Sequence, residues 1–185
     1  MKCDIIYFVE RRPNMSRYKI GDYLMHESAG VCQVDKIEEL ALSGKGSEKE
    51  YYELRPVYQE DGQVITPVDD KNGRLRDIKS REEMETILNN TDDIGEINVS
   101  NNREFQDKVK SVIADFDPRS LASVLKTVYI RKKRRLSTGK KTMSMDERVL
   151  QVCGKKLFDE MAFVLQKKQD DVAGLFYAGI DKTLD

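Results

Sequence analysis

The chain has 185 residues, with 32 Lys and Arg against 33 Asp and Glu, so its net charge is −1. Apolar residues make up 39% of it and recur at regular spacings, which excludes a disordered chain and favours one or two small folded domains. No apolar run approaches the roughly 18 residues that span a membrane, and Cys3, Cys32 and Cys153 form no pair typical of a zinc site or a disulfide framework. We therefore expect a cytoplasmic protein with no membrane partner.

The near-zero net charge hides an uneven distribution along the chain. Residues 1–100 carry 14 basic and 21 acidic side chains, whereas residues 101–185 carry 18 basic and 12 acidic ones. An acidic first part and a basic second part indicate two surfaces with different partners. The basic surface is a candidate for binding phosphate backbones.

The first residues of the chain have a different sequence pattern from the residues after Met15. Its apolar run is too short and too acidic for a signal peptide. We expect residues 1–14 to be an extension, with the first domain beginning at Met15.

The pattern over residues 15–79 is typical of short β-strands. Tyr23–His26 and Val31–Ile37 alternate between polar and apolar residues and are separated by a turn at Ala29-Gly30. Asp61-Gly62 is typical of a tight hairpin turn between two further strands. Five short strands with tight turns predict a small β-barrel of the SH3 or Tudor type.

From residue 80 onward, apolar residues recur with the spacing of amphipathic helices. Ser80–Glu83 and Ser144–Glu147 both have the sequence of a capping box, and Asp117-Pro118 is typical of a helix start. The polar, acidic segment Asn89–Ser100 is the expected domain boundary. We predict a helix and linker over residues 80–100 and a compact helical bundle over residues 101–185, ending in a short helix at Val172–Tyr177. The predicted class is α+β.

Candidate catalytic residues are scarce. His26 is the single histidine and falls within a predicted strand, where a structural role is commoner than a catalytic one. The sequence contains no phosphate-binding loop, dinucleotide-binding fingerprint or zinc-protease motif. We therefore expect no enzymatic activity, no cofactor and no metal.

Five consecutive cations, Arg131–Arg135, close the strongest amphipathic helix, and Lys140 and Lys141 follow just beyond it. One interpretation is a solvated helix end whose cations complement the helix dipole, for which one or two would suffice. The other is a phosphate-binding surface, because an anionic partner relieves the mutual repulsion of so many cations. A helix with Asn, Gln and Arg at base-reading spacing is not evident, so binding would follow the backbone or shape of the nucleic acid.

Several segments in the same order resemble the CarD/CdnL family of bacterial transcription regulators. The resemblance covers about residues 17–166 and rests on Ile20–Asp22, Gly30–Val34, Lys49–Leu54, Thr66–Val68, Leu121–Lys133 and Leu136–Lys140. It implies that the barrel, which is similar to the polymerase-interacting module of transcription-repair coupling factors, docks on the RNA polymerase β subunit. It also implies that the helical domain contacts promoter DNA at the upstream edge of the bubble and slows bubble collapse.

The chain departs from the family pattern at two places. Members insert a Trp into the minor groove, but this chain has none, and Asn101 or Asn102 stands near that position. Leu40 and Ile65 stand where members place arginines that face the polymerase.

The resemblance and the basic block together give a set of expected contacts. We expect docking on polymerase through an edge strand, and contacts to the DNA backbone by a monomeric protein. The expected DNA-contacting residues are Asn101, Asn102, Arg103, Lys108, Arg131, Lys132, Arg134, Arg135, Lys140 and Lys141. The alternative function is a stand-alone Tudor- or SH3-like adaptor that binds RNA or another protein.

Overall fold

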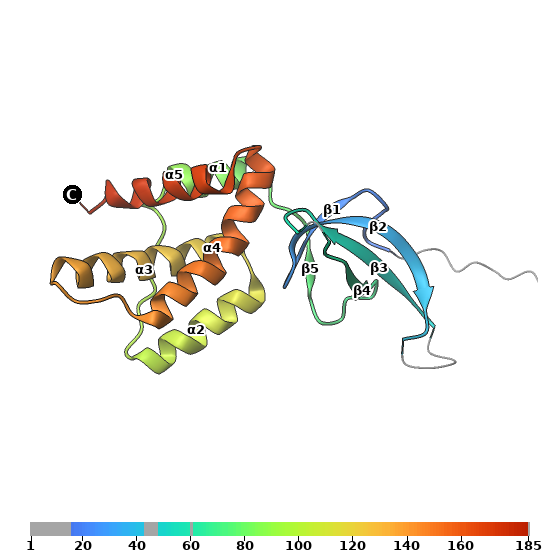
Figure 1. Cartoon of the computed structure of the whole chain (residues 1–185), viewed down its shortest axis with the longest axis horizontal. Helices are drawn as coiled ribbons and strands as arrows, with labels where there is room; N and C mark the ends of the chain where they lie inside the picture. Colours follow the sequence, from blue (N-terminus) through green and yellow to red (C-terminus); the bar gives the residue numbers. More distant parts are fainter. Residues whose placement is uncertain (1–15, 43–47, 60, 185) are drawn as a thin grey trace, which may run out of the picture.

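The computed structural model describes residues 16–42, 48–59 and 61–184. The predicted extension over residues 1–14 lies outside them. An antiparallel sheet is followed by helices, as Figure 1 shows, so the predicted α+β class is confirmed. Within the described ranges, no helix is both long enough and apolar enough to cross a membrane.

The sheet has five strands in the order β4-β3-β2-β1-β5, and each neighbouring pair is antiparallel. Among the described residues, β4 and β5 do not pair with each other, so closure into a barrel is not shown. The strands are β1 (Tyr23–His26), β2 (Gly30–Leu40), β3 (Lys49–Pro56), β4 (Val64–Pro67) and β5 (Leu75–Arg76).

The two faces of the sheet pack differently because successive strand residues point to opposite sides. One face carries a buried core of its own, to which Leu24, Val34, Tyr52 and Leu54 contribute. On the other face, Met25 and Val31 form a small buried cluster with Phe116, beside which Ile78 and Phe163 pack. The helices that follow the sheet therefore cover one end of this second face.

The helices are α1 (Arg81–Asn89), α2 (Asn102–Asp115), α3 (Pro118–Ser137), α4 (Ser144–Leu165) and α5 (Gln169–Asp181), which together we call the helical part. Their apolar stripes meet in one core, which includes Leu121, Leu125, Leu157, Met161 and Phe176. Helix α5 is longer than the short helix predicted at Val172–Tyr177.

Two of the three predicted helix caps are observed. The capping box at Ser80 and Glu83 is present, and Asp117 caps α3 with Pro118 at its first position, as predicted. The box at Ser144 is wrong. Met143 is the N-cap of α4, and Ser144 is already inside the helix. The carboxylate of Glu147 instead accepts a hydrogen bond from the Thr142 hydroxyl.

Helix α1 and the segment after it are packed into the helical part. Met84, Ile87 and Leu88 of α1 are buried in its core. The loop over residues 90–101 is held on α3 by the side chains of Ser123, Lys126 and Thr127, which bond to its backbone. The sequence pattern, which is polar and acidic here, did not indicate this packing.

Candidate functional site

Strand β4 lies at one edge of the sheet, where no other described strand pairs with its outer side. Ile65 lies at its centre with 43% of its surface exposed, opposite Glu53 of β3, and no described strand pairs on its other side. Unpaired backbone groups beside an exposed aliphatic side chain are what an added strand from a partner requires. The β4 edge therefore offers a docking surface.

Leu40, the second residue predicted to face a partner, lies elsewhere on the sheet. It is half-buried at the end of β2, opposite Lys49. Ile65 of β4 pairs with Glu53 of β3, which in turn pairs with Lys36 of β2. Leu40 lies four positions after Lys36 along β2. At about 3.3 Å per residue this places Leu40 about 13 Å further along the strand. The structure does not bring Leu40 and Ile65 together.

The end of the basic helix α3 is only partly free to bind an anion. The Arg131 guanidinium donates to both carboxylate oxygens of Asp146, which is fully buried, with Nε at 3.0 Å from Oδ2. The same guanidinium carbon lies 4.5 Å from the ring centroid of Phe105. Arg131 thus neutralises a buried charge and joins α2, α3 and α4.

Two further cations at this helix end have internal partners. Lys133 pairs with Asp181 at 3.1 Å and lies over the Tyr129 ring. The Nε of Arg135 donates to the carbonyl oxygen of Lys141 at 3.1 Å, which leaves the rest of its guanidinium available.

The cations that remain are Lys132 and Arg134 within the run, and Lys140 and Lys141 just beyond it. Within the part of the chain that the structure describes, no carboxylate pairs with the side chains of Lys132, Arg134, Lys140 or Lys141. All four are exposed or half-exposed. We call these four residues the basic tip. The tip combines the last two turns of α3 with the loop after it, so exposed positive charge extends past the helix end.

The beginning of α2 lies beside this part of α3. Asn101 is the N-cap, and its side-chain oxygen accepts from the backbone N–H of Glu104 at 2.9 Å. Asn102 and Arg103 are exposed on the first turn, close to Phe105 and hence to Arg131.

Lys108 lies apart from these residues. It lines a shallow groove with Arg119 at the other end of α3. At about 1.5 Å per residue, Arg119 lies about 20 Å from Lys132 along α3, so Lys108 lies apart from the basic tip. Arg119 was not predicted from the sequence, because an isolated cation belongs to no pattern.

The sheet lies within a segment that matches a known domain family. Residues 18–79 match the family model described as the CarD-like/TRCF RID domain. The N-terminal domain is a CarD-like/TRCF RID domain. The match contains all five strands and ends before α1. A search of curated proteins found no match to the chain.

Membership of this family implies interaction of the RID domain with RNA polymerase. The part of the expected resemblance that the comparison supports is therefore residues 18–79, which include Leu40 and Ile65. The expected DNA-contacting residues lie outside the match. Their roles stay predictions that rest on charge and exposure.

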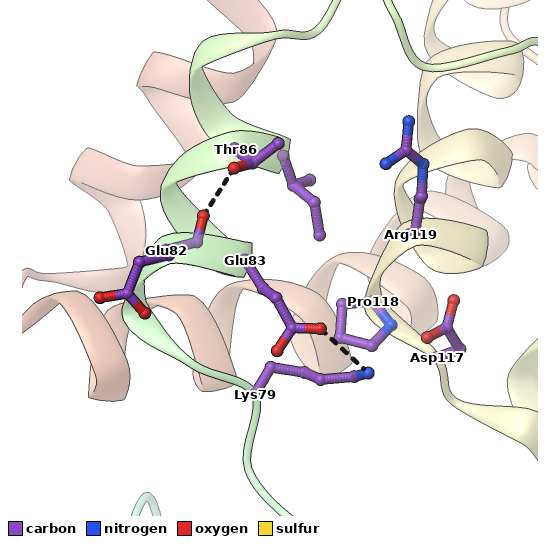
Figure 2. A pocket seen from close by; sticks show the side chains of 8 residues that line it. Lys79, Glu82, Glu83, Thr86, Asp117, Pro118 and Arg119 are labelled. Atoms are coloured by element: carbon purple, nitrogen blue, oxygen red, sulfur yellow. Dashed lines mark hydrogen bonds and ion pairs between the residues drawn. The ribbon is translucent and has the colours of Figure 1, made fainter.

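Other hollows and polar clusters have local structural explanations. A hollow of about 240 Å³ lies between α1 and the first turn of α3, and Figure 2 shows the side chains that line it. The Lys79 ammonium there lies 3.3 Å from the Glu83 carboxylate, and Asp117 is occupied as a helix cap. In the described ranges, no three potential metal-ligating side chains come together.

His26, which sits in the RID domain, has a structural setting as well. Its ring Nδ1 accepts from the backbone N–H groups of Ser28 and Ala29, both at 3.2 Å, and so shapes the turn between β1 and β2. Burial lowers the pKa of His26, because the charged ring loses its hydration.

Proposed function

We propose that this chain is a regulator of bacterial transcription that acts as a monomer in the cytoplasm. In this proposal it docks on the β subunit of RNA polymerase through the RID domain and contacts promoter DNA through the basic tip. The observation that carries the proposal is the family match over the whole sheet. The action is binding and not catalysis.

The polymerase contact is best assigned to the β4 edge. The opposite edge strand, β5, has only two residues, and the side chain of Arg76 within it is engaged with the helical part. Among the residues that the structure describes, no strand pairs with the outer edge of β4, which presents Ile65. Backbone pairing supplies the contact there, so the family's arginines are not required at this position.

The DNA contact is best assigned to the basic tip together with Asn102 and Arg103. Within the described ranges, no carboxylate pairs with these cations, whereas Arg131 is already paired with Asp146. Contacts to phosphate oxygens carry no sequence information. Binding is therefore independent of sequence and depends strongly on salt.

A variant of the basic tip tests the DNA contact. Changing Lys132, Arg134, Lys140 and Lys141 to Ala should weaken binding equally on unrelated duplexes. The log–log salt slope should flatten by about 0.9 for each phosphate that is no longer neutralised. Lys36→Ala, on the sheet, is the matched control and should leave the slope unchanged. Sequence-dependent loss contradicts backbone binding, and strong preference for RNA supports the adaptor alternative.

Stabilisation of the promoter open complex would use polar contacts in place of a Trp wedge. Asn101 is committed to capping α2, so Asn102 is the exposed residue at the helix start that is free to meet the minor-groove edge. Arg103 would hold an adjacent phosphate.

The lifetime of the open complex with purified polymerase measures this step. Wild type should lengthen it, and Asn102→Trp should lengthen it further, since an inserted aromatic kinks DNA and extends contact. Gln106→Trp, one turn further along α2, is the control and should match wild type. A wild-type protein that binds polymerase but leaves the lifetime unchanged at every promoter contradicts this step.

A further inference from the structure

The RID domain and the helical part are joined by a buried polar contact. Arg76 of β5 makes two hydrogen bonds to the Glu160 carboxylate of α4, at 2.7 and 2.6 Å. Glu160 is fully buried, and its Oε1 also accepts from the backbone N–H of Lys79 at 3.0 Å. Three donors thus converge on one buried carboxylate.

The same arginine also caps the end of α2. Its Nη2 donates to the carbonyl oxygen of Phe116 at 2.9 Å, and its guanidinium carbon lies 5.0 Å from the Phe116 ring centroid. Phe116 is the C-cap residue of α2, with φ of 39°. We call Arg76, Phe116 and Glu160 the interdomain clamp. It fixes one strand of the RID domain to two separate helices.

Two further contacts near the clamp join α4 to the RID domain; we call this interface the joint. Lys156 of α4 donates to the carbonyl oxygen of Glu27, in the turn between β1 and β2. The rings of Tyr23 and Phe163 lie 4.9 Å apart between centroids. The apolar part of the joint is small: in the part of the chain that the structure describes, its buried members are Met25, Val31 and Phe116.

A small apolar contact alone would leave two domains free to rotate, because relative motion is the default for interfaces that are not large and hydrophobic. A bidentate arginine–carboxylate pair adds directional constraint, since both hydrogen bonds hold only in one plane and at one angle. Because the Glu160 side chain is fully buried, a rotation that broke the pair while the carboxylate stayed enclosed would leave an unpaired buried charge. The clamp therefore selects one relative orientation.

We propose that Arg76 and Glu160 are positioning residues that hold the RID domain and the helical part as one rigid body, so that docking on polymerase determines where the basic tip meets DNA. The functional half of this inference rests on the proposed function. The structural half, a single fixed orientation, stands without it.

Distance measurement between paired spin labels tests the rigid body directly. In the Cys3→Ser full-length chain, labels are placed at Gln63→Cys, just before β4, and Leu175→Cys on α5, which are both exposed. Burial raises the thiol pKa of Cys32 to about 12 and that of Cys153 to about 11, so both native cysteines stay unlabelled at neutral pH.

The unmodified clamp should give one narrow distance distribution, and Arg76→Ala should broaden it or add a second distance. Because Arg76→Ala leaves Glu160 unpaired and can unfold the protein, two further variants are measured. Glu160→Gln keeps the shape, and Arg76→Met combined with Glu160→Met leaves no unpaired charge. Lys36→Ala, which breaks an ion pair within the sheet, is the control. Unchanged distributions in every folded clamp variant overturn the inference.

Affinities for polymerase, for DNA and for the complex of the two distinguish a loss of orientation from a loss of docking. Folded clamp variants should match wild type on polymerase alone and on DNA alone. On polymerase bound to promoter DNA they should lose on the order of tenfold or more in affinity, because a loosened joint lowers the effective concentration of the second contact. Equal affinity for the promoter complex overturns the functional half. If wild type does not bind polymerase at all, the proposed function fails, while the distance measurement still decides the clamp.

Discussion

Lys126 should be one of the largest single contributors to the stability of the helical part. Its ammonium is buried and donates to the carbonyl oxygens of Thr91 at 2.8 Å, Asp92 at 3.3 Å and Ile94 at 2.8 Å. Lys126→Met keeps the aliphatic stem and removes all three hydrogen bonds. The loop between α1 and α2 then loses its main attachment to α3.

The expected loss of stability can be worked out from the bonds removed. A hydrogen bond to a charged group contributes about 1.5–3 kcal/mol. Two such bonds are short here, and part of their contribution is offset because the ammonium no longer has to be desolvated. We expect the free energy of unfolding to fall by about 2–4 kcal/mol. For a chain of this size the melting temperature should fall by about 5–15 °C.

Urea unfolding of Lys126→Met measures this loss, and the exposed Lys167→Met is the control, with an expected change within about 0.5 kcal/mol. Limited proteolysis adds a local readout. Residues 90–101 should resist cleavage in wild type and become an early cut site in the variant. A change as small as that of the control, or early cleavage of wild type in this loop, would refute the role assigned to Lys126.

Two further predictions concern buried charged or titratable groups. Burial lowers the pKa of His26 in the folded chain below its usual 6.5, so the unfolded chain takes up a proton at a higher pH than the folded chain does. The free energy of unfolding should therefore fall as the pH drops from 7.5 to 5.5, by at most about 1.4 kcal/mol per pH unit. His26→Asn keeps an acceptor for the turn and should flatten that dependence in chemical unfolding curves; an unchanged slope would assign it to other groups. Arg131→Met strands the buried Asp146 and should cost about 3–5 kcal/mol in the same assay. Arg131→Met with Asp146→Leu should recover most of that loss, and a double variant as unstable as the single one contradicts a buried-pair role.

Local signals in the sequence predicted the elements well, because they act over a few residues. Asp117-Pro118 marked the start of α3, and the alternation around Tyr23 and Val31 marked β1 and β2. The failure at Ser144 has a local cause too. A capping box needs the serine outside the helix, and here the helix begins one residue earlier, after Met143.

Long-range partners could not be predicted in the same way. Arg131 belonged to an obvious basic run, yet its partner Asp146 lies 15 residues away on another helix. The five-residue run therefore overstated the free charge, and the basic tip contains only some of the residues predicted to bind DNA. Arg76 and Glu160 are 84 residues apart and belong to no motif, so only the three-dimensional structure reveals the clamp.

Binding of the full-length chain to purified bacterial RNA polymerase tests the central claim most directly. We predict that wild type binds, and that Ile65→Glu, which places a charge on the free β4 edge, weakens binding at least about tenfold. Leu175→Glu places the same charge on an exposed aliphatic position of α5 and should bind like wild type. Absence of wild-type binding would contradict docking on polymerase, and full binding by Ile65→Glu would contradict the β4 edge as the docking surface.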